Sequence, residues 1–122
     1  MRFYQSFTLT LIAALLVSCS VVAPGRRESE RRGREAKLRD ELMAMRSMID
    51  QYAADKGELP KSLDDLLRAG YLREIPADPI TKKPDWKLIM GEDPNRPGES
   101  GILNIRSSSI ERSIDGQPYS EW

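Results

Sequence analysis

The sequence contains no histidine and a single cysteine, and its basic and acidic residues cancel. Without histidine, the chain lacks the commonest general base and the commonest neutral metal ligand. One cysteine excludes a disulfide within the chain, and it excludes a zinc or iron–sulfur site built from several cysteines. The 19 basic and 19 acidic residues leave no net charge, whereas proteins that bind nucleic acids usually carry a basic excess. The composition therefore favours neither an enzyme nor a nucleic-acid-binding protein.

Adjacent acidic residues occur twice, as Asp64-Asp65 and as Glu92-Asp93. Neighbours in a helix do not face each other, so we expect these pairs to be solvated and not catalytic. The sequence also has no glycine-rich phosphate-binding loop. We therefore predict no catalytic residue, no small-molecule substrate and no bound cofactor. The length of 122 residues allows one small domain.

An apolar segment lies near the N-terminus. Residues 7–17 (FTLTLIAALLV) are eleven residues interrupted only by two threonines. This is the length of the apolar part of a signal peptide, and it is shorter than the roughly 20 residues that a membrane-spanning helix needs. The segment therefore predicts a signal peptide or a short apolar anchor.

The end of this segment resembles the lipobox of bacterial lipoproteins: Leu16, Val17, Ser18, Cys19. The resemblance implies that the Cys19 thiol receives a diacylglycerol, that residues 1–18 are removed, and that acyl chains hold the mature chain on a membrane. The alternative is a plain apolar anchor in which Cys19 is an ordinary small residue. Ser20 follows the cysteine, and in the lipoprotein sorting pattern a residue other than aspartate favours the outer membrane. We expect the periplasmic face of a bacterial envelope membrane.

Residues 26–37 (RRESERRGREAK) contain no large apolar side chain. This composition indicates a solvated helical stem or a flexible linker. Its excess of arginines could contact anionic lipid head groups, although Glu28, Glu30 and Glu35 offset much of that charge. We assign residues 19–35 to this charged segment and residues 36–122 to the folded domain.

The pattern changes at the start of the domain. Five apolar residues recur there at spacings of 4 and 3, as on one face of an α-helix: Leu38, Leu42, Met45, Ile49 and Tyr52. We predict a helix from about residue 29 to residue 56, ended by Gly57, with Arg39 and Arg46 pointing away from the buried face.

The rest of the domain shows weaker but ordered signals. Ser62 is expected to begin a short helix, with Asp65 as its capping partner. Residues 86–90 and 102–106 are predicted strands that pair antiparallel if they form a hairpin, with Trp86, Leu88 and Met90 on one face. A turn at Asp115-Gly116 precedes Trp122, which we expect to pack back onto the domain. The fold class predicted is α+β.

Five stretches, in this order and spacing, resemble the major (G-type) pseudopilin of type II secretion systems: IDQYAADKGELPKSLDDLLRAGYL, IPADPITKKPDW, GILNIRS, SIDG and PYSEW. The resemblance implies a pilin-like fold, in which a long helix and a short helix pack on a small antiparallel sheet. It also implies a structural or interaction role in, or derived from, a type II secretion or type IV pilus-like assembly, with other pseudopilins or secretion proteins as partners.

The residues that carry this resemblance are expected to be structural. They are Tyr52, Pro60, Leu63, Leu66, Tyr71, Leu72, Pro76, Asp78, Pro79, Trp86, Gly101, Ser107, Asp115, Gly116, Tyr119 and Trp122. The Asp78 side chain is expected to accept hydrogen bonds from backbone amides of the proline-rich loop. Trp86 is expected to seal the sheet over the helix.

The sequence departs from the family pattern at several positions. Residues 6–9 resemble the start of a prepilin, but Leu11 stands where that family has glutamate. Lys82 replaces a usual glycine after Thr81, and Asn104 replaces an aspartate. These departures keep an alternative open, a stand-alone bacterial lipoprotein that uses the pilin-like domain as a binding module.

Some members of the family bind calcium in the loop before the C-terminus. In this sequence Glu111 and Asp115 are the acidic candidates that remain there. A calcium ion takes six to eight oxygen ligands, so these two side chains make a weak candidate site. A simple turn is the alternative explanation for Asp115-Gly116.

Overall fold

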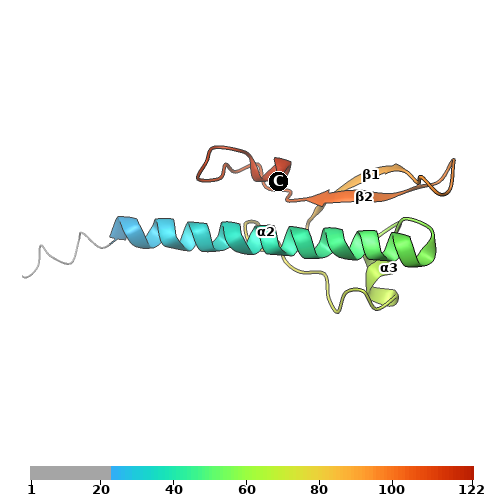
Figure 1. Ribbon diagram of the computed structural model, residues 1–122. Coiled ribbons are helices and arrows are strands. Elements are labelled where there is room, and N and C mark those ends of the chain that lie inside the picture. The colour runs from blue at the N-terminus through green and yellow to red at the C-terminus, as the bar shows by residue number, and fades with distance from the viewer. Residues whose placement is uncertain (1–22) are drawn as a thin grey trace, which may run out of the picture. The chain divides into compact units, whose positions relative to one another are not determined.

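The computed structural model describes residues 23–122, and its longest element is the helix α2 (Ala23–Lys56) (Figure 1). The helix begins earlier than the sequence predicts, with Pro24 in its first turn, where a missing N–H costs no intrahelical hydrogen bond. It ends as predicted at Gly57, whose positive φ of 69° suits a residue without a side chain. The described part of the charged segment, residues 23–35, is therefore helical. Among the described residues, no helix is both long enough and apolar enough to cross a membrane.

The chain divides into two units, the first ending at Arg32 and the second comprising Gly33–Trp122. The second unit contains the short helix α3 (Leu63–Arg68), which begins where the sequence predicts. The Ser62 side chain accepts a hydrogen bond from the Asp65 backbone N–H at 3.3 Å. The Asp65 carboxylate accepts the N–H of Lys61 at 2.9 Å, one residue before the position that a regular capping box uses.

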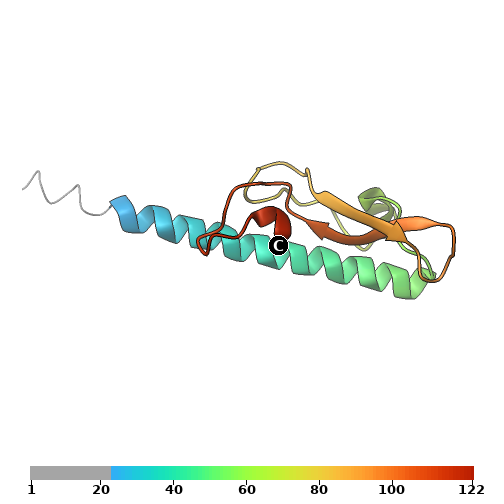
Figure 2. The same cartoon turned by 90° about the horizontal axis from the view of Figure 1, so that it is seen from above.

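The sheet has two strands, β1 (Lys87–Glu92) and β2 (Ser100–Arg106). They pair antiparallel, so the prediction of a hairpin is confirmed, and each strand is slightly longer than expected. Figure 2 shows the hairpin lying along α2. A single 3-10 turn (Tyr119–Glu121) follows near the C-terminus. Mixed helix and antiparallel sheet make the fold α+β, as predicted.

A β-bulge interrupts the hairpin. The register shifts between Ile89 and Met90, because Leu103 has no partner residue in β1. Regular alternation stops at such a bulge. The sequence predicts Trp86, Leu88 and Met90 on one face. Trp86 is buried and Leu88 packs against the core, whereas Met90, beyond the register shift, is 47% exposed.

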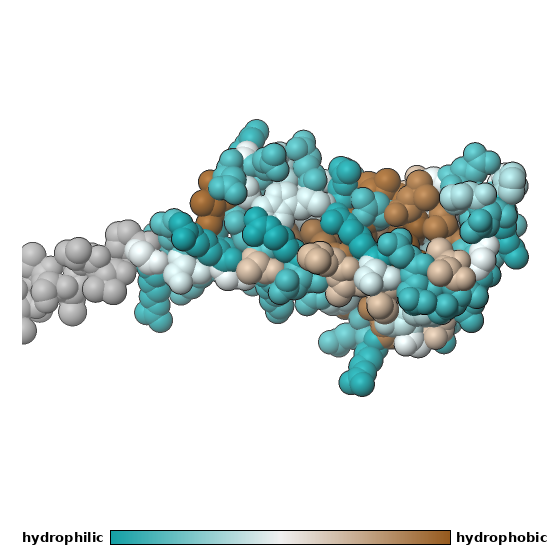
Figure 3. Space-filling model, viewed as in Figure 1, coloured by the Kyte–Doolittle hydropathy of each residue, from teal (hydrophilic) through white to brown (hydrophobic). Residues whose placement is uncertain are grey.

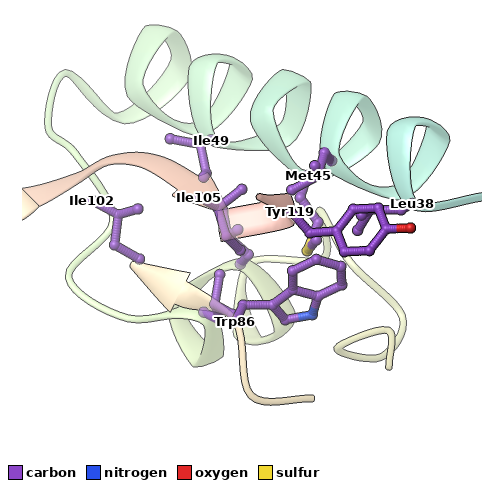
Figure 4. Close-up of a cluster of buried hydrophobic side chains, with 10 residues drawn as sticks. Leu38, Met45, Ile49, Trp86, Ile102, Ile105 and Tyr119 are labelled. Carbon is purple, nitrogen blue, oxygen red and sulfur yellow. The ribbon is translucent and has the colours of Figure 1, made fainter. Parts of the chain in front are cut away.

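One core lies between α2, α3, the sheet and the C-terminal segment (Figure 4). The face of α2 predicted from the spacing is buried from Leu38 to Ile49, and Tyr52 packs against it. The buried members of the core are Leu38, Leu42, Met45, Ile49, Leu63, Leu66, Trp86, Ile102, Ile105 and Tyr119. Partly buried residues packed on them include Tyr71, Leu72, Ile75 and Trp122.

Candidate functional site

The predicted lipid-attachment residue, Cys19, lies outside the described residues, and so does the whole lipobox: Leu16, Val17, Ser18 and Cys19. The same holds for the sorting position, Ser20. Lipid attachment at this cysteine stays a prediction. The residues that carry the family resemblance lie in the described part of the chain, where they form three sets of contacts between segments far apart in sequence.

The first set joins the proline-rich loop to the end of the sheet. Asp78 is fully buried and accepts hydrogen bonds from the Ile80 N–H at 2.7 Å and from the Ser107 hydroxyl. Trp86 donates its indole N–H to the Pro76 carbonyl at 2.7 Å. The predictions that Asp78 binds a loop amide and that Trp86 is buried between sheet and helix are thus confirmed.

The loop that contains Asp78 and the buried Pro79 also holds a residue in an unusual conformation. Lys82 has a φ of 64°, and its N–H donates to the Asp78 carbonyl at 2.8 Å. This left-handed region costs a residue with a side chain of the order of 1–2 kcal/mol, whereas glycine adopts it freely. Position 82 therefore favours glycine on conformational grounds.

The second set joins the chain after α2 to β2. The Ile102 N–H donates to the Pro60 carbonyl at 2.8 Å. Gly101 lies so close to this segment that an added Cβ would stand 2.4 Å from the Leu59 Cβ. The backbones can approach in this way only because Gly101 has no side chain.

Asp93, in the hairpin loop, strengthens this second contact. Its carboxylate accepts the N–H of Leu59 at 2.8 Å and the N–H of Asn95 at 2.9 Å. These backbone hydrogen bonds, the Leu59 bond first, lower the pKa of the Asp93 carboxyl below its ordinary value. The expectation that Glu92-Asp93 is solvated is wrong for Asp93, which is buried. The pair of adjacent acidic residues in the sequence does not reveal that Asp93 binds Leu59, because the two residues are 34 positions apart.

Beside this contact, Tyr52 and Tyr71 meet edge to face with ring centroids 5.6 Å apart. The Tyr71 hydroxyl donates to the Asp55 carboxylate. This bond, followed by one from Gln51, lowers the pKa of Asp55. The pair closes the end of α2 over the segment that follows α3.

The third set docks the C-terminal segment onto α2. Glu35 is buried, although the sequence predicts it in the charged segment. Its Oε1 accepts the N–H of Ile114 at 2.8 Å and the hydroxyl of Tyr119 at 2.7 Å. A buried carboxylate needs such donors, because burying it without hydrogen bonds is costly. Glu35 thus belongs to the domain's packing.

Trp122 packs back onto the domain, as predicted. Its ring meets Tyr119 edge to face at 5.2 Å, and the Arg39 guanidinium lies 4.4 Å above the ring centroid. Arg46 donates to the Trp122 carbonyl at 2.7 Å and to the Asn104 side chain at 2.7 Å. The prediction that Arg46 points away from the packed face is therefore wrong. Burial, and then the charge of Arg106, lower the pKa of Arg46.

A shallow hollow of about 350 Å³ opens beside these residues. Leu42, Met43 and Trp122 form its apolar part, and Arg39 and Arg46 line it as well, together with acidic residues of the C-terminal segment. Arginine, methionine and tryptophan are enriched at protein interfaces.

The calcium candidates do not form a ligand cluster. Over residues 23–122, the structure contains no group of three or more acidic, cysteine or histidine side chains that could hold a metal ion. Glu111 and Asp115 are both exposed. Asp115-Gly116 forms the turn that was the alternative explanation, since Gly116 has a φ of 89° and donates its N–H to the Ser113 carbonyl at 2.9 Å.

Comparisons of the chain with protein-family models, curated proteins and solved structures find no significant match. Sequence reasoning missed three charged residues whose hydrogen bonds join distant segments: Glu35, Arg46 and Asp93. Only Asn104, noted as a departure from the family pattern, points to one of these contacts from the sequence.

Proposed function

We propose that the chain is a pseudopilin-like protein of the bacterial envelope, anchored through an acylated Cys19. Its role is structural or interactive, in or derived from a type II secretion or type IV pilus-like assembly. Residues 36–122 supply a pilin-like domain that makes contacts with proteins and carries out no chemistry.

One observation carries this proposal: the residues on which the family resemblance rests make contacts that hold the fold together. Asp78 accepts a hydrogen bond from Ser107, and Gly101 lies against the segment of Pro60. Tyr119 and Trp122 are hydrogen-bonded to Glu35 and Arg46 of α2. Each of these contacts joins segments that lie far apart in the sequence. If the resemblance had arisen by chance, the matching residues would not be expected to fall at positions that make such contacts. This coincidence supports a common architecture.

The departures from the family pattern are compatible with the same architecture. Lys82 adopts a conformation that suits the family's glycine. Asn104 accepts from Arg46 through Oδ1, and the carboxylate of an aspartate would accept the same bond. Both substitutions therefore leave the backbone arrangement in place.

A second candidate is a free-standing lipoprotein that has kept the domain as a binding module. Leu11 favours it, because the family's glutamate at that place pairs with the N-terminal amine of a neighbouring subunit during assembly. The hollow beside Trp122 would then be the contact surface. The second candidate requires the acyl anchor, whereas an assembly subunit could also be held by the apolar segment. The two candidates differ further in whether the protein copurifies with other assembly subunits.

Metabolic labelling with a radioactive fatty acid tests the anchor. We expect the wild-type chain to incorporate label, Cys19→Ala to lose it and leave the membrane fraction, and Ser18→Ala to keep it, since alanine fits a lipobox. Labelling of Cys19→Ala at the wild-type level would contradict the proposed lipid anchor.

A further inference from the structure

The two edges of the sheet differ in what lies against them. At the outer edge of β2, the Ile102 N–H donates to the Pro60 carbonyl at 2.8 Å. Among the described residues, no segment pairs with the outer edge of β1. Both strands belong to the second unit of the chain. β1 is therefore a free edge, and such an edge can bind a further extended strand through its backbone.

The register of the hairpin shows which backbone groups face this free edge. Ile102 uses its N–H for Pro60, so the pair that it forms with Met90 is a non-hydrogen-bonded pair of the ladder. The N–H and C=O of Met90 therefore point away from β2. Those of Leu88 and Glu92 point the same way, because the direction alternates along a strand. β1 thus offers the backbone groups of these residues to a partner strand.

Apolar side chains surround the same edge. Met90 is 47% exposed and Leu103 is 46% exposed. Leu88 packs on the core, so Ile89, the next residue along β1, faces the other side of the sheet. On that side the Leu103 side chain fills the space above Gly91, where an added Cβ would collide with it. Figure 3 shows hydrophobic surface, in brown, over the hairpin, so the free edge has apolar surface beside it.

We propose that β1 pairs antiparallel with β1 of a second copy of this chain, across a two-fold axis at Met90. In this register Met90 lies opposite Met90 of the second copy, and the two residues exchange backbone hydrogen bonds. Ile89 lies opposite Gly91 of the second copy, so it packs beside the Leu103 that covers this glycine. The apolar surfaces of the two hairpins become continuous, and the interface has the commonest symmetry of protein dimers.

The charges at the ends of β1 favour a second copy as the occupant. In the same register Lys87 lies opposite Asp93 of the second copy and one position from its Glu92. Among the described residues, no acidic side chain forms an ion pair with Lys87. A parallel pairing would place like charges side by side, which is unfavourable. The edge is therefore complementary in charge to an antiparallel copy of itself.

Disulfide cross-linking of the full chain, in cells treated with a thiol oxidant, tests this pairing. A contact between two short strands is small, and cross-linking traps a short-lived pair. Met90→Cys places two thiols across the two-fold axis, within the separation that a disulfide spans. Met43→Cys is the control, since Met43 is more exposed, at 67%, but lies on α2.

We expect Met90→Cys to give about fivefold more cross-linked dimer than Met43→Cys, or a larger excess. Equal yields from the two variants would overturn the inference.

Two substitutions that change the net charge equally test the register. Lys87→Glu, added to Met90→Cys, should lower the yield of dimer about threefold or more, because like charges then meet at both ends of the strand pair. Lys37→Glu, at an exposed position of α2, should leave the yield unchanged. Both variants should keep the circular dichroism of the parent chain. An equal yield from the two variants would contradict the proposed register.

The pairing goes beyond the proposed function and does not depend on the acyl anchor, and the wild-type chain separates the two. Cys19 is its only cysteine, and an acylated thiol cannot form a disulfide. A cross-linked wild-type dimer would therefore contradict the anchor alone. Met90→Cys combined with Cys19→Ala should still give the dimer, and its absence there would overturn the pairing.

Discussion

Two stretches of α2 have the same helical backbone but differ in burial: one has exposed charged side chains, and the other has a buried apolar face. Around residues 25–34 the side chains are exposed, and the described contacts are ion pairs between residues four apart. From Leu38 to Ile49 one face of the helix is buried in the core. Exposed ion pairs contribute little to stability, whereas each buried aliphatic side chain contributes substantially. The second stretch therefore holds the fold, whereas the first contributes little to its stability.

The largest expected effect comes from two methionines of this helix. Met45 is fully buried, whereas Met43 is 67% exposed. We expect Met45→Ala to lower the free energy of unfolding by about 2–5 kcal/mol, because it leaves a cavity in the core. Met43→Ala should change it by less than about 0.5 kcal/mol. Both changes have the same helix propensity, so equal effects in chemical denaturation would contradict the assigned burial.

Two glycines should respond with opposite signs. Gly101→Ala places a Cβ 2.4 Å from the Leu59 Cβ, so we expect a loss of about 1–3 kcal/mol in the free energy of unfolding. Gly33 is in the helix and has nothing within 4 Å of its Cβ position. Gly33→Ala should raise helicity, seen by circular dichroism, with a gain of up to about 1 kcal/mol. A harmless Gly101→Ala would refute the close approach of β2 to Leu59.

Acid should weaken the domain partly through Asp93. Its carboxyl has a lowered pKa in the folded chain, so its ionised form stabilises the fold. That stabilisation is complete above the unfolded pKa of about 3.9 and is lost as the pH falls through the lower folded pKa.

Asp93→Asn should therefore reduce stability at neutral pH and flatten its decline in acid, as measured by denaturation at several pH values. Part of the loss of stability in acid should remain in this variant, because the pKa values of three other carboxyl groups are also lowered: Asp55, Asp65 and Asp85. Asp50→Asn, at an exposed position, is the control and should leave the profile unchanged. A wild-type pH profile for Asp93→Asn would contradict the role given to its hydrogen bonds.

The smallest effect is expected in the proline-rich loop. Lys82→Gly relieves the positive φ, and this gain exceeds the entropy that glycine adds to the unfolded chain, so we expect about 0.5 kcal/mol of stabilisation. Lys83→Gly should lower the stability of the domain. Lys83 does not have a positive φ, so glycine relieves no strain there and only adds entropy to the unfolded chain. A loss of stability in both variants would argue against the left-handed conformation at position 82.

Sequence periodicity predicted the elements well where burial follows a regular spacing. The buried face of α2, the Ser62 cap and the two strands were predicted from local signals alone. The alternation failed at Met90, because a bulge depends on the pairing of two strands and leaves no mark in one of them.

The charged contacts could not be predicted from the sequence. Glu35 and Arg46 lie on α2 among other charged residues, and their partners are 79 and 76 residues away. A helical wheel separates polar from apolar side chains. It cannot show that a polar side chain is hydrogen-bonded to a backbone N–H or carbonyl far away in the sequence. Gly101 and Asp78 were singled out by the family resemblance. The structure supplies the physical reason for Gly101 and confirms the bond to a loop amide that was predicted for Asp78.

The intact mass of the protein extracted from membranes shows directly whether Cys19 carries the acyl anchor. We predict a chain that starts at Cys19 and carries the added mass of a diacylglycerol, with or without a further acyl chain. A mass that starts at Phe7 without lipid would contradict it and indicate processing as a prepilin. An unprocessed, unmodified chain starting at Met1 would contradict both forms of processing.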